Sequence, residues 1–478
     1  MGRLGNSLFQ IASVMGIASK LGTTAAFPLW TYGRYFKTKL PRLHKNKPDL
    51  YEPCFHYDDT WFQDDRDYVG WLQSEKYFES RESVKELFEF DTTFKALVDS
   101  KHRAKFEKET ICVSIRRGDF VGNENYELIP IKYYIGALLE LDWKECNILF
   151  FSDDISYCRK HFECLDNAYF IDSDAIEQLY LMTKCTYHVI SNSTFSWWGA
   201  YLSESKRVIR PAYNFGESYL KKYNDKDYYC ADWDVFDHKN YYIPLDTTFL
   251  IPVQYDHEDR LFNFSLCVRY LRENFKCRIL TAENNGDRFK CDLRFEFPKF
   301  HRTKMLNIMA RTSETDTIVL YDADVLTPPM QLYLGLERLK EVDVVYPYDG
   351  RFARVPRRHF PELNTYMDIG VLGDKLEGTK DHDLKSVGGA VMFNKKAFFA
   401  GGGENEDFVS YAPEDKYRWE LFNKFFKVER IKGILYHVDH FIGLDSYVHH
   451  EDYQRNLDVY ERFKNMTDEE IRVYRSIS

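Results

Sequence analysis

Short apolar runs alternate with amphipathic segments along most of the chain. In the N-terminal half, residues 111–115, 147–151 and 188–190 are apolar runs that predict buried strands, and residues 176–184 and 195–203 have the spacing of helices. Such alternation is typical of α/β layer structures with parallel strands. We therefore expect an α/β fold for this half.

The pattern breaks between Glu217 and Asp246, where the chain is polar, aromatic and without period. A second α/β series then begins at Thr248, with predicted strands at 248–255, 277–281 and 317–321 and predicted helices at 260–274 and 304–312. This restart predicts two domains, residues 1–237 and 247–478, with a linker near residues 226–246. A length of 478 residues suits two large domains, at on the order of 150 residues or more each.

The composition of the chain narrows the classes of function and the cellular compartment that we expect. The net charge is −10 and no basic run is present, which argues against a nucleic-acid partner. The aromatic fraction of 17% suits a rich core or surfaces that stack on bases and sugars. Ten cysteines without a C-x-x-C pair predict free thiols in a reducing compartment. With neither a signal peptide nor an integral membrane segment visible, we expect a cytoplasmic protein.

Polar residues follow two predicted strands of the N-terminal half. Arg116, Arg117 and Asp119 follow the strand at 111–115, and Asp153 and Asp154 follow the strand at 147–151. Ligands of open α/β sheets bind at the carboxyl ends of strands. Two guanidinium groups there can hold a diphosphate, although a surface salt bridge between Arg117 and Asp119 is the alternative. The two later carboxylates could take a ribose hydroxyl or a guanine edge.

Two further segments resemble anion sites at helix starts. Gly2 and Gly5 with Asn6 precede an apolar helix and suit a turn whose N–H groups face an anion, although such a glycine pair is more often an ordinary tight turn. Ser193 and Thr194 follow the strand at 188–190 and begin the next predicted helix. We expect both segments to join the diphosphate site.

Together these segments resemble the α-1,2-fucosyltransferase family over residues 1–213. The match is complete at Ser191–Trp198, whereas Ser7 and Ser114 replace the usual Gln and His. The resemblance implies a GT-B-like, Rossmann-type domain that uses GDP-fucose without a metal. It assigns donor binding to Gly5, Asn6, Arg116, Arg117, Asp153, Asp154, Ser193 and Thr194, and we add Asp119 as a candidate catalytic residue.

The C-terminal half contains an apolar strand that ends in Asp322-Ala323-Asp324. Two carboxylates at a strand end are suitable ligands for Mn²⁺ or Mg²⁺ beside a nucleotide diphosphate, although D-x-D is often structural. His437, or His440 three residues later, could complete the metal site. Gly388-Gly389-Ala390 and the acid pair Glu414–Asp415 could form an acceptor site with a general base, although acids also favour any helix start.

This order resembles GT-A enzymes of the galactosyltransferase and chondroitin-polymerase type over residues 247–446. The resemblance implies a mixed sheet with helices on both faces, metal ligation by Asp322, Asp324 and His437, and acceptor contacts from Gly388–Ala390, Glu414 and Asp415. Tyr411-Ala412-Pro413 departs from the usual acceptor loop.

The sequence therefore predicts a bifunctional glycosyltransferase that builds a fucosylated glycan. One half would transfer fucose from GDP-fucose in α-1,2 linkage, and the other would transfer a second sugar, from a UDP-sugar, to a glycan acceptor. Both transfers are expected to invert the anomeric centre. Two alternatives stay open: only one active half, or a non-catalytic glycan-binding or scaffold protein.

Overall fold

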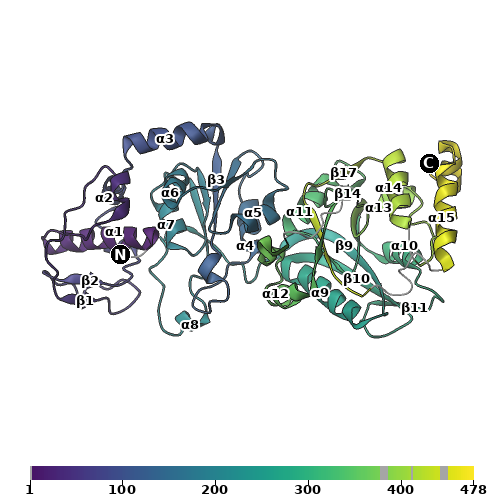
Figure 1. Ribbon diagram of the computed structural model, residues 1–478, viewed down its shortest axis with the longest axis horizontal. Helices are drawn as coiled ribbons and strands as arrows, with labels where there is room; N and C mark the ends of the chain where they lie inside the picture. The colour runs from purple at the N-terminus through teal and green to yellow at the C-terminus, as the bar shows by residue number, and fades with distance from the viewer. Residues whose placement is uncertain (1–2, 377–385, 411–412, 442–450, 478) are drawn as a thin grey trace. The chain divides into compact units, whose positions relative to one another are not determined.

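The computed structural model describes residues 3–376, 386–410, 413–441 and 451–477. They form two compact units, the first made of Met1–Cys158 and Asn167–Tyr241 and the second of Arg159–Asp166 and Tyr242–Ser478 (Figure 1). Within the described ranges, no helix is both long and apolar enough to cross a membrane. The ten cysteines are free thiols, and seven of them are buried.

The first unit is built on a six-stranded sheet in the order β5-β4-β3-β6-β7-β8, with every neighbouring pair parallel. Helices α6 and α7 lie on one side of it and α4 and α5 on the other (Figure 1). Because both faces are covered, all six residues of β3 are buried. The predicted strands and helices of this half are confirmed to within one or two residues. The strands are β1 Asp49–Tyr51, β2 Asp67–Val69, β3 Thr110–Ile115, β4 Asn147–Ser152, β5 Ala168–Ile171, β6 Tyr187–Val189, β7 Arg207–Pro211 and β8 Asp234–Phe236, and the helices are α1 Leu4–Leu21, α2 Arg81–Leu87, α3 Thr92–His102, α4 Ile131–Leu139, α5 Ile155–Phe162, α6 Ala175–Thr183, α7 Thr194–Tyr201 and α8 Glu217–Leu220.

Helix α1 begins earlier than the predicted glycine turn allows. Gly5 lies inside its first turn, so the predicted turn at Gly5 is wrong, and Gly2 lies outside the described residues. A Cβ on Gly5 would stand 2.7 Å from Thr194 Oγ1 and 2.8 Å from the Phe195 nitrogen. The glycine is therefore needed for close approach of α1 to the start of α7. Phe9 secures this contact, with its ring 4.5 Å from that of Trp197.

The segment predicted to end in a linker belongs mostly to the first unit. Tyr228, Cys230 and Trp233 are buried in its core, and β8 is the edge strand of its sheet. These residues pack as single side chains along irregular backbone, which leaves no periodic signal in the sequence. The division between units falls between Tyr241 and Tyr242.

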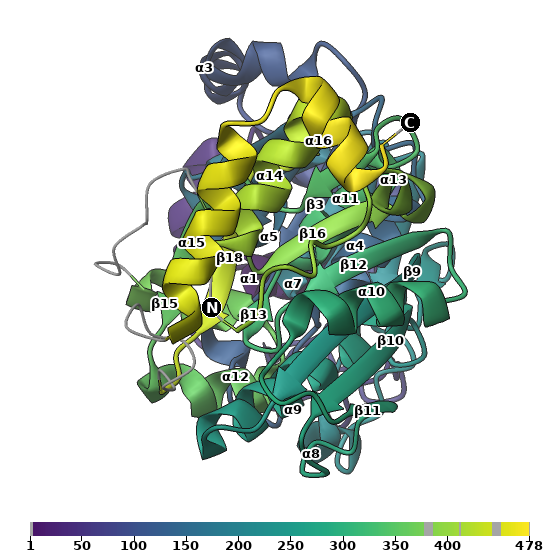
Figure 2. The same ribbon diagram turned by 90° about the vertical axis from the view of Figure 1, so that its right-hand side faces the viewer.

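The second unit contains a seven-stranded mixed sheet in the order β11-β10-β9-β12-β16-β14-β17 and a three-stranded sheet in the order β13-β18-β15. Strand β9 starts at Ile243, five residues before the predicted strand. Its first residues alternate between buried and exposed, so they do not form the apolar run that predicted the rest of the strand. Helices α9, α10 and α11 pack on β9 and β10, while α14 and α15 lie side by side (Figure 2). The strands are β9 Ile243–Gln254, β10 Phe275–Asn284, β11 Leu293–Phe295, β12 Thr317–Tyr321, β13 Val325–Leu326, β14 Val344–Tyr346, β15 Arg351–Val355, β16 Ala390–Asn394, β17 Val428–Arg430 and β18 Ile434–Val438, and the helices are α9 Glu258–Asn274, α10 Arg302–Thr312, α11 Pro329–Arg338, α12 Phe360–Tyr366, α13 Lys395–Ala400, α14 Glu414–Phe425, α15 Glu451–Lys464 and α16 Asp468–Arg475.

Candidate functional sites

A pocket of about 600 Å³ opens in the first unit where β3 and β4 end and α7 begins. Six of the eight predicted donor-binding residues line it, together with the candidate catalytic residue Asp119; the six are Gly5, Asn6, Arg116, Asp153, Ser193 and Thr194. The parallel sheet brings these residues together because its strands all end at the same edge. The volume is in the range of small-molecule sites.

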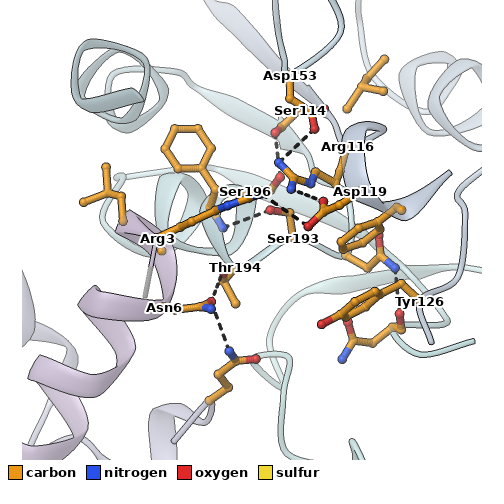
Figure 3. A pocket seen from close by; sticks show the side chains of 18 of the residues that line it. Arg3, Asn6, Ser114, Arg116, Asp119, Tyr126, Asp153, Ser193, Thr194 and Ser196 are labelled. Carbon is orange, nitrogen blue, oxygen red and sulfur yellow. Dashed lines mark hydrogen bonds and ion pairs between the residues drawn. The ribbon is translucent and has the colours of Figure 1, made fainter. Parts of the chain in front are cut away.

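Arg116 is the central cation of this pocket. Its guanidinium forms ion pairs with Asp119 and, at 3.0 Å, with Asp153, and Figure 3 shows it between these two carboxylates. Arg3 reaches Asp119 from the start of α1 at 3.4 Å. A salt bridge to Asp119, the alternative to a ligand role, therefore exists, but Arg116 forms it and Arg117 does not. A diphosphate must replace at least one carboxylate around this guanidinium.

Two predicted donor-binding residues lie elsewhere. Arg117 is 4% exposed, does not line the pocket, and holds its guanidinium 4.3 Å from the centre of the Tyr157 ring. Successive residues of an extended chain point in opposite directions, so only one arginine of the pair can face the ligand. Asp154 accepts a hydrogen bond from the Tyr157 nitrogen at 3.0 Å and caps the start of α5. Neither side chain lines the pocket, and donor contact by Arg117 and Asp154 stays a prediction.

The start of α7 is joined to α1 through hydrogen bonds. Ser193 caps the helix by accepting from the Phe195 nitrogen, and Thr194 donates to Asn6 Oδ1 at 2.9 Å. Gln73 donates to the same oxygen at 3.3 Å. The first and third sequence segments thus form one wall of the pocket, as Figure 3 shows for Asn6 and Thr194.

Ser114 belongs to a chain of three hydroxyls. Its Oγ lies 2.7 Å from Ser196 Oγ, which in turn lies 2.8 Å from Ser191 Oγ. Ser114 and Ser196 line the pocket and Ser191 does not. The chain couples the end of β3 to the first turn of α7.

Sequence reasoning missed the pocket residues that come from irregular segments. Tyr32, Phe55, Trp71 and Gln73 all line the pocket and lie between α1 and α2. No periodic pattern precedes or follows them in the sequence, so no signal there predicted their position.

In the second unit, two predicted metal ligands, Asp324 and His437, lie together with His440. Asp324, His437 and His440 have ligand atoms within 4.8 Å of one another, because β13, which follows Asp324, pairs with β18. His440 Nε2 lies 3.2 Å and His437 Nε2 3.7 Å from the Asp324 carboxylate. Arg260 also donates to Asp324, at 2.6 Å. Both histidines left open by the sequence therefore join this cluster.

The electrostatics favour an ionised carboxylate in this cluster. Burial raises the pKa of Asp324, but His437, His440 and Arg260 outweigh it and hold the pKa well below its usual range. Burial lowers the pKa of His437, which favours the neutral imidazole that a metal requires.

Asp322 is held apart from this cluster. Arg302 donates to its carboxylate at 2.6 Å, and it is absent from the group of described residues that could hold an ion. Burial raises the pKa of Asp322 despite the Arg302 charge. Its backbone nitrogen donates to the Gly389 carbonyl at 2.8 Å, and a Cβ on Gly388 would stand 2.3 Å from Asp415 Oδ2. The glycine segment therefore lies between the D-x-D strand and the acid pair.

The acid pair begins α14, as the macrodipole alternative also predicts. Asp415 accepts from Arg418 at 2.7 Å and faces Arg302 at 3.7 Å. Burial and then the Asp415 charge raise the pKa of Glu414 to about 7. Asp415 is hydrogen-bonded to Arg418, whereas Glu414 lies 3.9 Å from Arg302 and keeps its neutral form to a higher pH than an ordinary glutamate. Tyr411 and Ala412, in the predicted acceptor loop, lie outside the described residues.

The chain is similar to curated glycosyltransferases. An alpha-1,2-colitosyltransferase of Escherichia coli is 36% identical over 150 residues, covering 28% of this chain and 51% of the relative. A galactoside 2-alpha-L-fucosyltransferase of Caenorhabditis elegans is 25% identical over 273 residues, covering 48% of this chain and 76% of the relative. The chain thus spans only about half the length of the bacterial relative.

Solved structures give weaker likenesses. The fucosyltransferase NodZ from Bradyrhizobium is 13% identical with a TM-score of 0.32, covering 43% of this chain and 90% of its own. The catalytic domain of Drosophila beta1,4galactosyltransferase 7 is 15% identical with a TM-score of 0.27, covering 45% of this chain and 73% of its own. Scores this low do not establish a shared fold.

A family model matches the first unit more directly. The residues that match a family model are those that build the parallel sheet and its pocket. They end at Phe236, five residues before the division between units. The N-terminal half of this chain, residues 1–236, matches the model of glycosyl transferase family 11.

Proposed function

We propose that the first unit is a GT-B-like fucosyltransferase that transfers L-fucose from GDP-fucose to a glycan in α-1,2 linkage. The observation that carries the proposal is Arg116 in a pocket at the strand ends, within the segment that matches the family model. A guanidinium and a helix start in one wall suit a diphosphate.

In this proposal each side chain has a separate role. Arg116 takes up charge on the departing diphosphate, and the Ser193–Thr194 helix start adds hydrogen bonds to it. The acceptor hydroxyl attacks the fucose anomeric carbon from the opposite face as the bond to GDP breaks, which inverts the centre. Asp119, 51% exposed beside Arg116, receives the hydroxyl proton.

GDP titration of the full chain tests this assignment. We expect GDP to bind the parent chain in the presence of EDTA, and Arg116→Ala to weaken that binding. GDP binding that is unaffected by Arg116→Ala would contradict the donor role.

We further propose that the second unit is a GT-A-like glycosyltransferase that requires Mn²⁺ or Mg²⁺ and uses a UDP-sugar. The Asp324, His437 and His440 set fits such an ion, because one carboxylate and two imidazoles leave positions open for phosphate oxygens. A bound ion would neutralise charge on the nucleotide diphosphate. Ligation needs an ionised Asp324 and neutral imidazoles, and burial of His437 favours its neutral form.

The remaining residues would serve the acceptor of this second reaction. Asp415 stays our proposed base, beside Gly388 and within the Arg302–Arg418 charge cluster. UDP titration with and without Mn²⁺ tests the unit, since Asp415→Asn should retain UDP affinity and Asp324→Ala should lose it. Equal losses in the two variants would make Asp415 a donor or metal residue.

A further inference from the structure

One side of the first unit's pocket is lined by aromatic rings that touch one another in series. We call this series the aromatic wall; its members are Phe120, Tyr126, Tyr219, Phe215, Phe55 and Trp71. They come from four separate stretches of the chain, so the fold and not the sequence assembles them. The Arg116 and Ser193–Thr194 groups line the same pocket.

The rings form an unbroken sequence of contacts. Phe120 and Tyr126 stack with centres 4.3 Å apart and planes within 6°, and Tyr219 follows at 5.6 Å from Tyr126. Phe215 then contacts Tyr219 at 5.3 Å and Phe55 at 4.7 Å. Trp71 ends the series, 5.5 Å from Phe55.

Burial divides the wall into two layers. Phe55, Phe120 and Phe215 are buried, with at most 7% of each exposed. Tyr126, Tyr219 and Trp71 are only half-buried although each packs on another ring. The inner layer therefore fixes the orientation of three outer rings that remain available at the pocket surface.

The wall adjoins the ion pairs at one end. Arg116 lies 5.4 Å from the centre of the Phe120 ring. Asp119 precedes Phe120 in the chain and forms an ion pair with Arg116, so it lies at this end of the wall. A ligand seated on the outer rings would therefore lie beside the proposed proton acceptor.

A pyranose ring suits this surface better than a diphosphate does. Its C–H face is apolar and weakly positive, and matches the negative face of an aromatic ring, while its hydroxyls point outward. A diphosphate needs donors and cations, which Arg116 and the Ser193–Thr194 helix start provide in the same pocket. We propose that Trp71, Tyr126 and Tyr219 form the acceptor subsite and hold a hexopyranose with its reacting hydroxyl toward Asp119.

This inference rests on the proposed fucosyl transfer, and the experiment separates the two. The full chain and its Tyr126→Ala, Tyr219→Ala and Trp71→Leu variants are compared in GDP affinity and in KM for hexose-terminated acceptors, beginning with lactose. Each loss of a stacking ring should raise the acceptor KM roughly tenfold while changing GDP affinity less than twofold. Tyr223→Leu is the matched control, because Tyr223 contacts Trp71 at 4.9 Å and Tyr219 at 5.2 Å but does not line the pocket.

The outcomes are distinct. An increase in KM confined to the three outer rings supports the subsite. GDP affinity lost in parallel would show that the rings bind the donor base, and equal effects of Tyr223→Leu would show that they only hold the wall together; either result overturns the inference. If the parent chain binds GDP but transfers to none of the acceptors, the inference fails while the donor site stands. If GDP does not bind at all, the proposed function itself fails.

Discussion

The two units carry opposite chemistry at comparable places in their sheets. In the first, the ends of β3 and β4 present a guanidinium between two carboxylates, with hydroxyls at a helix start. In the second, the end of β12 leads to a carboxylate beside two imidazoles. Under the functions we propose, both arrangements would receive a nucleotide diphosphate, one directly and the other through an ion.

The comparison shows how each site neutralises its central charged side chain before a substrate binds. Arg116 is a cation already neutralised by acids, so its ligand must compete with Asp119 and Asp153. Asp324 is an anion already faced by Arg260 and two histidines, so an ion must compete with Arg260. We expect the Arg116 site and the Asp324 site to bind their ligands independently of each other.

The largest effect should follow loss of the pocket cation. Arg116→Ala should lower fucosyl turnover roughly a hundred- to a thousandfold, because one charge-assisted contact to the leaving group is removed. Arg117→Ala should instead lower the free energy of unfolding by about 2–3 kcal/mol, since its guanidinium is buried against Tyr157. Kinetics and urea unfolding of both variants measure this. The reverse assignment of effects would restore Arg117 as the ligand.

This pair also shows what the sequence could and could not predict. Strand ends were predictable because buried parallel strands are continuous apolar runs, and thus the edge carrying Arg116, Asp153 and Ser193 was located correctly. Which arginine of the pair faces the pocket depends on backbone direction after Ile115, which no periodicity encodes. The start of α1 at Leu4 depends on contact with α7, which is likewise tertiary.

In the second unit, too, tertiary contacts decide which charged residues meet. The sequence placed Asp322 and Asp324 together as ligands, but α10 brings Arg302 to the first of them, and strand pairing brings two histidines to the second. The pairing of β13 with β18 joins residues more than a hundred positions apart, which explains why the role of His440 stayed open.

Loss of the second cluster should be the next largest effect. Asp324→Ala should lower UDP affinity in Mn²⁺ on the order of a hundredfold, because the central carboxylate of the set is removed. Isothermal titration with UDP and with GDP measures both units in one chain. GDP affinity should remain unchanged in the variant and in EDTA, and a parallel loss of GDP binding would contradict separate sites.

Glu414 predicts a pH-dependent stability. Its folded pKa of about 7 lies above the ordinary value, so the neutral form is favoured by folding, and the stability it contributes in acid is lost as pH rises through 7. Glu414→Gln should match the parent at pH 4 and exceed its free energy of unfolding at pH 8 by at most about 3 kcal/mol. Urea unfolding at both pH values measures this. Glu420→Gln, in the same helix, is the control, and an identical pH profile for all three proteins would refute the assignment.

The smallest expected effect separates structure from binding within the hydroxyl chain. Ser114 and Ser191 each contact Ser196 Oγ, at 2.7 and 2.8 Å, and both are buried. Alanine at either position removes one hydrogen bond of this chain and should cost about 1 kcal/mol of unfolding free energy. Only Ser114 lines the pocket, so only Ser114→Ala removes a hydroxyl that a bound donor can contact. We therefore expect similar losses of stability from the two variants, with a severalfold weaker GDP-fucose affinity for Ser114→Ala alone. Equal affinities would mean that Ser114 only fastens β3 to α7 and has no part in donor binding.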